Sequence, residues 1–398
     1  MKRSLRILLV VSGFPSAEKP FNGIFSLRFA KKLAKIADVT VVHLRAWLPG
    51  RPMISDSERD GLQVRTIACP QLQSFSVASI SLCRQLGWPL VRTLVRQCDL
   101  IHSVGVDFAG PVASAWAQRG RKHHVTQAIG SDLAVALPRI RDARLIRGWE
   151  NYVHGVVCNS VALARNFSAQ YPNSKNVCAI HRGVDLEYFQ SAGPIDGPLA
   201  ERPPVRYLFL GGFPGNGKDS FHTNIKGGDT LLAAWKAGED HLVHDGASLL
   251  VAGPLPKDDR LSRWRMTLRF PDQVHIAGSL RPESVPSYIR SCDAVLMPSL
   301  REGLPNVALE ASACSRPVFG SNIEGIADAV VHKKTGLLIP AGDAGAWKLE
   351  LVKYASQIAC LRMMGEAARR RMEKTFDAGN YVPEMLNLYR AALTEAIT

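Results

Sequence analysis

Short apolar runs alternate with longer amphipathic stretches along this chain, and this alternation restricts the fold more than any other feature. The apolar runs lie at residues 7–11, 39–44, 100–103, 125–128, 156–159 and 177–180, and again at 205–210, 248–252, 274–276, 294–297 and 317–320. Between the first two runs, Phe25, Phe29 and Leu33 fall at four-residue spacing, as on one face of a helix. Strands that alternate with helices predict βαβ units and a mostly parallel sheet.

A stretch rich in glycine and proline separates the two sets of runs. Residues 191–204 contain two glycines and four prolines, which cannot continue a helix or a central strand. The length of 398 residues also suits two domains. We therefore predict an α/β protein with two doubly wound, Rossmann-like domains that face a cleft, the first over residues 1–195 and the second over residues 196–376.

The end of the chain has helical spacing after the polar break at residues 377–380. Met385, Leu388, Ala392 and other apolar residues recur there every three or four positions. We expect a helix within residues 377–398 that crosses back to the first domain; a plain closing helix on the second domain is the alternative.

The positive charge of the chain is concentrated in its first half. The net charge is +14; residues 1–195 hold 25 Lys+Arg against 12 Asp+Glu, and the rest hold 24 against 23. This asymmetry predicts an anionic partner for the first half, either nucleic acid or a membrane surface. With 46% hydrophobic and 21% charged residues, the composition excludes a disordered, collagenous or membrane-bundle protein.

The sequence also bears on the compartment. The apolar run at residues 7–11 follows a basic start but is shorter than the roughly 7–15 residues of a signal-peptide core, so a buried strand is predicted there. No apolar stretch approaches the roughly 20 residues that span a bilayer. Eight scattered cysteines without a C-x-x-C motif predict reduced, packed thiols and a cytoplasmic protein.

The segment over residues 298–311 carries the most chemical information. It follows an apolar run, then Gly303 and Pro305 turn the chain and Asn306 can cap a helix. Backbone N–H groups at a helix start suit a phosphate. A carboxylate one turn into the helix, at Glu310, can accept hydrogen bonds from a ribose diol, and Glu302 can hold hydroxyls of a second ring. A nucleotide diphosphate with a terminal sugar fits this pattern; two surface glutamates near a helix start are the alternative.

Glu302 and Glu310, with seven residues between them, resemble the E-x7-E signature of retaining glycosyltransferases of family GT4, which have the GT-B fold. Other segments resemble the family in the same order along the chain. They are Gly23 to Phe25, Gly183 to Asp185 with Phe189, residues 224–232, Gly278, Tyr288, Cys292 with Asp293, Pro298 with Ser299, Ala311, Ala313 with Cys314, Pro317 with Val318, Gly325, residues 335–340 and Asp343. Together they extend over almost the whole sequence.

The resemblance implies a division of labour, in which the second domain holds the nucleotide sugar and the first holds the acceptor. The implied catalytic residues are Lys226, paired with the diphosphate, and Glu302, which holds the donor sugar. The implied donor-binding residues are Glu310 at the ribose, Gly23 close to the diphosphate, Lys218, Gly303, Leu304, Asn306 and Val307. His102 and Asp132 are candidates on the acceptor side, although a core position is the alternative for His102. The nucleotide sugar is the substrate, and no metal or other cofactor is expected.

The chain departs from the family pattern at two places. Most relatives have an arginine after the first strand of the second domain, where this chain has a glycine-rich segment over residues 211–218. Lys218 can replace that arginine, or the loop can close over the phosphates; an ordinary surface loop is the alternative. Ile129 stands where many relatives have a histidine that contacts the donor sugar, so the resemblance does not define how this chain holds its donor.

Basic residues in the first half accompany apolar ones at helical spacing. Arg84, Arg92 and Arg96 lie among leucines, valines and Trp88, and a second cluster spans residues 139–149. Basic amphipathic helices with tryptophan suit an anionic membrane surface, and solvated arginine faces on ordinary helices are the alternative. We expect no nucleic-acid partner, because the chain has no zinc module, RNP-type signature or aromatic platform.

Together these features predict a retaining hexosyltransferase that moves a sugar from a nucleotide-diphosphate sugar to a glycan or lipid-linked acceptor. We expect it to act in bacterial cell-surface polysaccharide synthesis, peripherally on the inner face of the plasma membrane. Two alternatives remain: a GT-B-like nucleotide-sugar epimerase, and a non-catalytic sugar-nucleotide-binding protein with the same fold.

Overall fold

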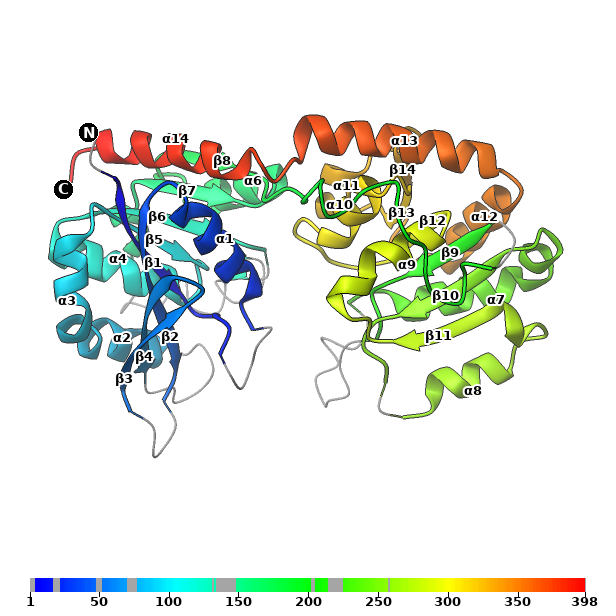
Figure 1. Cartoon of the computed structure of the whole chain (residues 1–398), viewed down its shortest axis with the longest axis horizontal. Helices are drawn as coiled ribbons and strands as arrows, with labels where there is room; N and C mark the ends of the chain where they lie inside the picture. Colours follow the sequence, from blue (N-terminus) through cyan, green and yellow to red (C-terminus); the bar gives the residue numbers. More distant parts are fainter. Residues whose placement is uncertain are drawn as a thin grey trace. The chain divides into compact units, whose positions relative to one another are not determined.

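A computed structural model of the chain describes residues 4–16, 22–47, 52–69, 77–130, 132–133, 148–201, 205–213, 225–256 and 258–397. The chain divides into two compact units (Figure 1): unit 1 is Met1–His181 with Tyr381–Thr398, and unit 2 is Arg182–Asn380. Each unit has a largely parallel sheet with helices on both faces. The predicted α/β class with two parallel-sheet domains is confirmed.

The sheet of unit 1 has the strand order β3-β4-β2-β1-β5-β6-β7-β8. Every neighbouring pair is parallel except β3 and β4, which form an antiparallel edge. The strands are β1 (Arg6–Val11), β2 (Asp38–Ala46), β3 (Ile54–Arg59), β4 (Leu62–Cys69), β5 (Leu100–Val104), β6 (His123–Ala128), β7 (Gly155–Cys158) and β8 (Val177–Ala179).

Two apolar layers cover the faces of this sheet. One layer joins the sheet to α2, α3, α4 and α6, and the other joins it to α1 and α14. The helices are α1 (Ile24–Ala34), α2 (Val77–Leu86), α3 (Trp88–Gln97), α4 (Ala109–Gly120), α6 (Val161–Gln170) and α14 (Tyr381–Thr394), with a 3-10 turn, η2 (Trp149–Tyr152). Ser160 caps α6 by accepting a hydrogen bond from the N–H of Leu163 at 3.1 Å.

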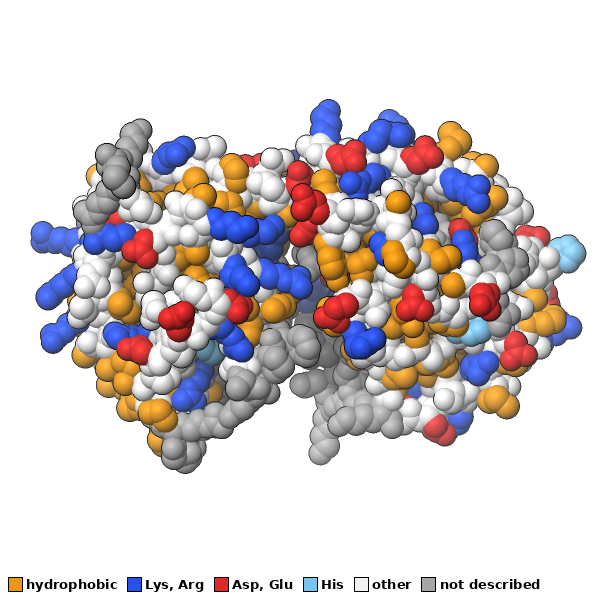
Figure 2. Space-filling model, in the orientation of Figure 1, with side chains coloured by type: hydrophobic (Ala, Val, Ile, Leu, Met, Phe, Trp, Pro, Cys, Tyr) orange, Lys and Arg blue, Asp and Glu red, His pale blue; other side chains and the backbone are white. Residues whose placement is uncertain are grey.

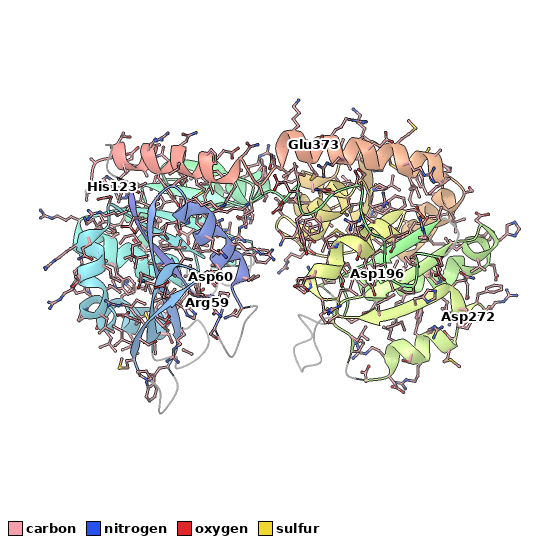
Figure 3. All side chains as sticks on the ribbon, in the orientation of Figure 1. Arg59, Asp60, His123, Asp196, Asp272 and Glu373 are labelled. Carbon is pink, nitrogen blue, oxygen red and sulfur yellow. A yellow bond between two sulfur atoms is a disulfide. The ribbon has the colours of Figure 1, made fainter. Side chains whose placement is uncertain are left out.

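The C-terminal helix α14 is part of unit 1, as the predicted crossing requires. Its apolar face, with Met385 and Leu388, is buried in the same layer as α1. The hydroxyl of Tyr389 lies 2.5 Å from Nδ1 of His102, and His123 lies beneath the helix, with Nε2 3.0 Å from the carbonyl oxygen of Glu395 (Figure 3). Buried apolar contacts and these hydrogen bonds fix the helix to the sheet.

The sheet of unit 2 has the strand order β11-β10-β9-β12-β13-β14 and is parallel throughout. The strands are β9 (Arg206–Phe209), β10 (Ser248–Ala252), β11 (Val274–Gly278), β12 (Ala294–Met297), β13 (Val318–Ser321) and β14 (Gly336–Ile339). The helices are α7 (Gly228–His244), α8 (Arg260–Met266), α9 (Val285–Ser291), α10 (Asn306–Ala313), α11 (Glu324–Ala329), α12 (Ala344–Ala355) and α13 (Ile358–Thr375), with 3-10 turns η3 (Pro271–Gln273) and η4 (Pro282–Ser284).

The boundary between the units lies earlier than the predicted break at 195/196. Residues 182–195 belong to unit 2 because hydrogen bonds fasten them there. The N–H of Val184 donates to the carbonyl of Phe376 at 2.8 Å, and Nε of Arg290 donates to the carbonyl of Pro194 at 2.8 Å. The described part of the glycine- and proline-rich stretch, residues 191–201, therefore belongs to unit 2, and the second boundary follows Asn380 rather than residue 376.

In the part of the chain that the structure describes, the predicted strands are present within two residues at each end, and three strands go beyond the predicted set: β3, β4 and β14. The exposed residues of β3 and the mixed burial of β4 explain why neither is an apolar run. β14 is only four residues long. The first apolar run is the buried strand β1, as predicted.

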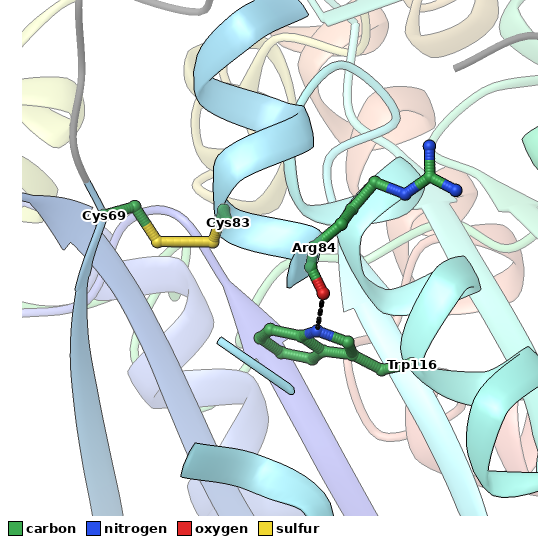
Figure 4. The surroundings of a disulfide bond; sticks show 4 residues. All are labelled: Cys69, Cys83, Arg84 and Trp116. Carbon is green, nitrogen blue, oxygen red and sulfur yellow. Dashed lines mark hydrogen bonds between the residues drawn. A yellow bond between two sulfur atoms is a disulfide. The ribbon is translucent and has the colours of Figure 1, made fainter. Parts of the chain in front are cut away.

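Two cysteines correct the prediction of reduced thiols. Cys69, at the end of β4, and Cys83, in α2, form a disulfide with their Cα atoms 5.4 Å apart (Figure 4). The prediction is wrong for this pair because the disulfide requires α2 to pack against β4. The spacing of cysteines along the chain does not reveal that packing. Beside them, Nε1 of Trp116 donates to the carbonyl of Arg84 at 3.3 Å.

Candidate functional site

Unit 2 has a pocket of about 300 Å³ at the carboxyl ends of β9 and β12. These strands are neighbours, but the chain runs from β9 outward to β10 and β11 on one side and from β12 to β13 and β14 on the other. The pocket therefore lies at the switch point of the sheet, where open α/β sheets bind ligands. Its lining includes Lys226, Ser299, Glu302, Leu304, Asn306 and Val307.

The loop before α7 brings Lys226 to this pocket. Gly227, the N-cap of α7, has a φ of 67°, a left-handed conformation that favours glycine. A Cβ atom at Gly227 would overlap the carbonyl group of Pro298. The N–H of Leu300 donates to the carbonyl of Ile225 at 2.9 Å, so the loop before α7 and the loop after β12 lie against each other.

An ion pair joins these two loops inside the pocket. Nζ of Lys226 donates to Oε1 of Glu302 at 2.7 Å, and Oγ of Ser299 donates to the same oxygen at 2.9 Å. The Glu302 side chain is 11% exposed and the Lys226 side chain 37%. The carboxylate is thus mostly removed from water, while the ammonium group remains reachable from the solvent.

The start of α10 forms another wall of the pocket. The helix begins at Asn306, with Pro305 rather than Asn306 as its N-cap, and no side chain accepts a hydrogen bond at this cap. The predicted capping role of Asn306 is therefore wrong by one position. The first turn has no acidic residue either. Helix-start N–H groups without a side-chain cap can bind an anionic group.

Gly303 follows Glu302 in a tightly packed turn. A Cβ atom at Gly325, in α11, would overlap the carbonyl oxygens of Glu302 and Gly303. Only glycine at position 325 allows α11 to approach the backbone of this turn so closely. The backbone on both sides of Glu302 is consequently held in place, by α11 on one side and by the loop before α7 on the other.

The remaining predicted donor residues lie elsewhere or outside the described residues. Glu310 lies one turn into α10, half-buried, and is not among the residues that line the pocket. Gly23 belongs to unit 1, where it is the N-cap of α1 with a φ of 69°, and a Cβ atom there would overlap the backbone of Gly13. Lys218 lies outside the described residues, as does the predicted arginine cluster over residues 139–147.

The two acceptor-side candidates are buried in unit 1. His102 is fully buried and bonded to Tyr389, which fits the core alternative. Asp132 is 4% exposed and accepts hydrogen bonds from the N–H groups of Val106, Ile129, Gly130 and Leu133 at 2.7–3.1 Å. Burial raises the pKa of the Asp132 carboxyl, although these hydrogen bonds oppose the shift. Both side chains are buried and hydrogen-bonded within unit 1, and their role on the acceptor side stays a prediction.

Residues 213–357, which include most of the pocket, match the family described as "Glycosyl transferases group 1". Unit 2 is a glycosyl transferases group 1 domain. Among curated relatives, the D-inositol 3-phosphate glycosyltransferase of Streptomyces bingchenggensis is 27% identical over 228 residues, which cover 53% of this chain and 46% of that protein. The chain thus spans about half the length of the curated relatives it matches.

Solved structures extend the likeness to the whole chain, at the level of fold. The sucrose-phosphate synthase of Thermosynechococcus elongatus has a TM-score of 0.70 at 20% identity, with 97% of this chain and 98% of that chain covered. Anabaena HepE, solved with UDP and glucose, has a TM-score of 0.68 at 15% identity, with 98% and 100% covered. The chain has the GT-B fold.

Sequence reasoning placed no role on Ser299, which lines the pocket of the glycosyl transferases group 1 domain. A signal was present, because a polar residue directly after a buried strand lies at the edge where parallel sheets bind ligands. Among the described residues, no three His, Cys, Asp or Glu side chains lie together as a metal site. The expectation of a reaction without a metal stays a prediction.

Proposed function

We propose that this chain transfers a sugar from a nucleotide-diphosphate sugar to a glycan or lipid-linked acceptor, with retention of the anomeric configuration. The observation that carries the proposal is the contact between Lys226 and Glu302 in a pocket at the switch point of unit 2. A cation, a buried carboxylate and an uncapped helix start suit a ligand with both negative charge and hydroxyls. The relative named a glycosyltransferase and the similar fold solved with UDP support a nucleotide sugar as that ligand.

Lys226 would act on the leaving group. As the bond between the anomeric carbon and the diphosphate oxygen breaks, negative charge grows on the nucleotide, and the ammonium group of Lys226 stabilises it. The first N–H groups of α10 add to this stabilisation. The acceptor hydroxyl oxygen then bonds to the anomeric carbon on the same face, and its proton passes to the leaving diphosphate.

The two glutamates would bind hydroxyl groups. Glu302 would accept hydrogen bonds from the donor sugar, since its carboxylate lines the pocket beside Lys226. Glu310 would accept them from the ribose, which places the nucleoside beyond the pocket along α10. Gly303, Leu304, Asn306 and Val307 would shape the wall between the two rings. We expect no bound metal, so turnover should survive excess EDTA.

We also propose that unit 1 carries an anionic-membrane contact, which suits a lipid-linked acceptor and a role in bacterial cell-surface polysaccharide synthesis at the inner face of the plasma membrane. Residues 77–98 and 108–131 contain no Asp or Glu. Arg92 and Arg96 are exposed on α3, and Arg119 and Arg121 are exposed at the end of α4, which packs on α3. Lys and Arg side chains project along this edge of unit 1 (Figure 2).

In this proposal the patch, defined by Arg92, Arg96, Arg119 and Arg121, binds peripherally to the anionic surface of the membrane. Among the described residues, none of the helices is long and apolar enough to cross a bilayer. Arg84 is only partly exposed, unlike these four arginines, and is not part of the patch.

The decisive experiment is a nucleotide-sugar panel scored first by thermal shift and then by transfer of labelled sugar. A ligand at 100 times its dissociation constant adds about 2.7 kcal/mol of stability, which a melting curve resolves. Lys226→Ala and Glu310→Ala should abolish transfer while circular dichroism and melting remain near wild type. Lys236→Ala, an exposed lysine of α7 bonded to Thr267, is the matched control and should keep full activity.

Three outcomes would replace the proposal. Unchanged turnover in both active-site variants would refute the assigned roles. Isomerised donor in the absence of any acceptor would instead identify a nucleotide-sugar epimerase. Donor binding without transfer or hydrolysis across the acceptor panel would identify a non-catalytic binding protein.

A further inference from the structure

Glu302 shares one carboxylate oxygen between two donors of different character. Nζ of Lys226 lies 2.7 Å from Oε1 and Oγ of Ser299 lies 2.9 Å from the same atom. Ser299 is 2% exposed, whereas the Lys226 side chain is 37% exposed. The ammonium group of Lys226 is carried on a flexible four-carbon stem. The hydroxyl is therefore the fixed partner of the carboxylate and the ammonium group is the movable one.

A diphosphate in the pocket competes with Glu302 for Lys226. It carries more negative charge than a single carboxylate, and the ammonium group can turn toward it because it is partly exposed. When Lys226 turns away, Oε1 of Glu302 loses a hydrogen bond in a site that is mostly shielded from water. Without a second donor, the buried carboxylate would be costly to keep in place and free to rotate away from the sugar.

The loop around Ser299 is built to stay in place during this exchange. Pro298 abuts Gly227, whose left-handed backbone leaves no room for a Cβ atom, and the N–H of Leu300 donates to Ile225. These contacts are made by the backbone, so movement of the Lys226 side chain does not disturb them. Ser299 consequently keeps its hydroxyl on Oε1 whether or not Lys226 is present.

We propose that Ser299 is a positioning residue, which holds the Glu302 carboxylate toward the donor sugar after a diphosphate has drawn Lys226 away. This inference rests on the proposed function and adds to it an exchange of partners: Lys226 leaves Glu302 for the diphosphate, and the Ser299–Glu302 hydrogen bond persists. The exchange makes and breaks no covalent bond.

The test compares binding of a nucleoside diphosphate with turnover of the nucleotide sugar that the panel selects. In Ser299→Ala, calorimetry should give a dissociation constant for the nucleoside diphosphate within twofold of wild type, because that ligand contacts Lys226. The kcat of transfer should fall at least tenfold, as expected for the loss of a hydrogen bond to a charged group. Ser299→Thr keeps a hydroxyl and should recover most of the rate.

A matched control separates positioning from general stability. Ser291→Ala removes a fully buried hydroxyl of unit 2 that donates to the carbonyl of Tyr288 at 2.7 Å, away from the pocket. It should leave kcat and nucleoside diphosphate binding near wild type, even if melting shifts as much as in Ser299→Ala.

The outcomes are distinguishable. If wild type transfers sugar and Ser299→Ala does so at the same rate, the inference is overturned and the proposed function stands. Equal losses of nucleoside diphosphate binding and kcat, or a failure of Ser299→Thr to recover any activity, would also overturn it. If wild type binds no nucleoside diphosphate and no nucleotide sugar, both proposals are overturned.

Discussion

Arg206 and Asp293 form a closed pair at the amino ends of β9 and β12. The carboxylate of Asp293 accepts hydrogen bonds from the backbone N–H, Nε and one terminal nitrogen of Arg206 at 2.8–3.1 Å, and its own N–H donates to the carbonyl of Arg206 at 2.7 Å. Arg6 and Asp99 repeat the same set of contacts in unit 1, between β1 and β5. Each pair joins the two strands at the switch point of its sheet, at the end opposite the loops that bind ligands.

The first prediction concerns these pairs. Asp293→Asn removes the anion from a pair whose side chains are only 17% and 10% exposed, so unit 2 should lose about 2 kcal/mol of stability. Hydrogen exchange of peptides that cover β9 and β12 should become faster, while peptides of unit 1 stay unchanged. Asp99→Asn, in the more exposed pair, should affect unit 1 alone and by less. A larger effect from Asp99→Asn would contradict this ranking.

The second prediction concerns Gly325. In Gly325→Ala the new methyl group overlaps the carbonyl oxygens of Glu302 and Gly303, so the turn that carries Glu302 has to shift. We expect kcat/KM for transfer to fall about 100-fold, because small displacements at a reacting centre are costly. Gly238→Ala in α7 is the control, since its new Cβ would meet side-chain atoms and no backbone: Lys348 and Val352 at 3.2 Å and Leu242 at 3.4 Å. Similar losses in both variants would show that activity is not specifically sensitive to this turn.

The third prediction concerns pH. Asp107 follows β5, and burial, with a smaller contribution from Asp132, raises its pKa to about 6. Between about pH 4 and pH 6 the Asp107 carboxyl is therefore protonated in the folded state and ionised in the unfolded chain. The stability that this protonation contributes is fully present below about pH 4 and is lost as the pH rises through 6.

Replacement by asparagine removes this dependence. Asp107→Asn should match wild type near pH 4 and exceed it by roughly 3 kcal/mol above pH 7, a shift of about two pKa units. Urea unfolding at half-unit pH intervals measures the difference. A stability difference that stays constant between pH 4 and 7 would remove the titration of Asp107 as its cause.

The fourth prediction concerns the disulfide. Cys69 and Cys83 are 14 residues apart, and a cross-link that closes a loop of this size stabilises a protein by about 3 kcal/mol. Protein denatured without reductant should expose six reactive thiols rather than eight, and reduction should lower the melting temperature of wild type. Cys83→Ala should melt at one temperature with or without reductant. Eight reactive thiols in the denatured, unreduced protein would disprove the link.

The fifth prediction concerns the basic patch of unit 1. Arg92→Gln combined with Arg96→Gln should weaken binding to vesicles of mixed phosphatidylcholine and phosphatidylserine by roughly 30-fold, at about 1 kcal/mol for each arginine. Raising the salt should weaken wild type in the same direction. Arg263→Gln with Arg269→Gln, two exposed arginines of unit 2, is the control for loss of charge. Salt-independent binding, or equal losses in both double variants, would exclude the patch as the contact.

The site was predictable where it depends on strand order. Lys226 and Glu302 are 76 positions apart, but Lys226 lies just before the helix α7 and Glu302 follows the strand β12. Parallel strands have their carboxyl ends at one edge of the sheet, so the loops after them meet there. The resemblance to the family, rather than strand order, implied roles for Lys226, Leu304, Asn306 and Val307, and all four line the pocket.

What sequence reasoning missed depends on packing between distant elements. A core position for His102 was one of the two interpretations of the sequence, but its partner Tyr389 lies in α14, 287 positions away, where local pattern does not reveal it. The Cys69–Cys83 link follows from how α2 lies on β4. Close backbone approaches at Gly227 and Gly325 likewise appear only when two loops meet. The local sequence pattern predicts the helices and strands and their order. Tertiary packing determines which polar residues remain accessible to a ligand.

The membership of α14 in unit 1 has a consequence for synthesis. Residues 182–380 are contiguous, so a ribosome releases all of unit 2 before it makes the helix that covers one face of the earlier sheet. Until then Leu9, Val125 and Val157, which share an apolar layer with Met385 and Leu388, lack part of their cover. The first half of the molecule to emerge is thus the second to finish folding, and its open apolar face is the surface that a chaperone would meet during translation.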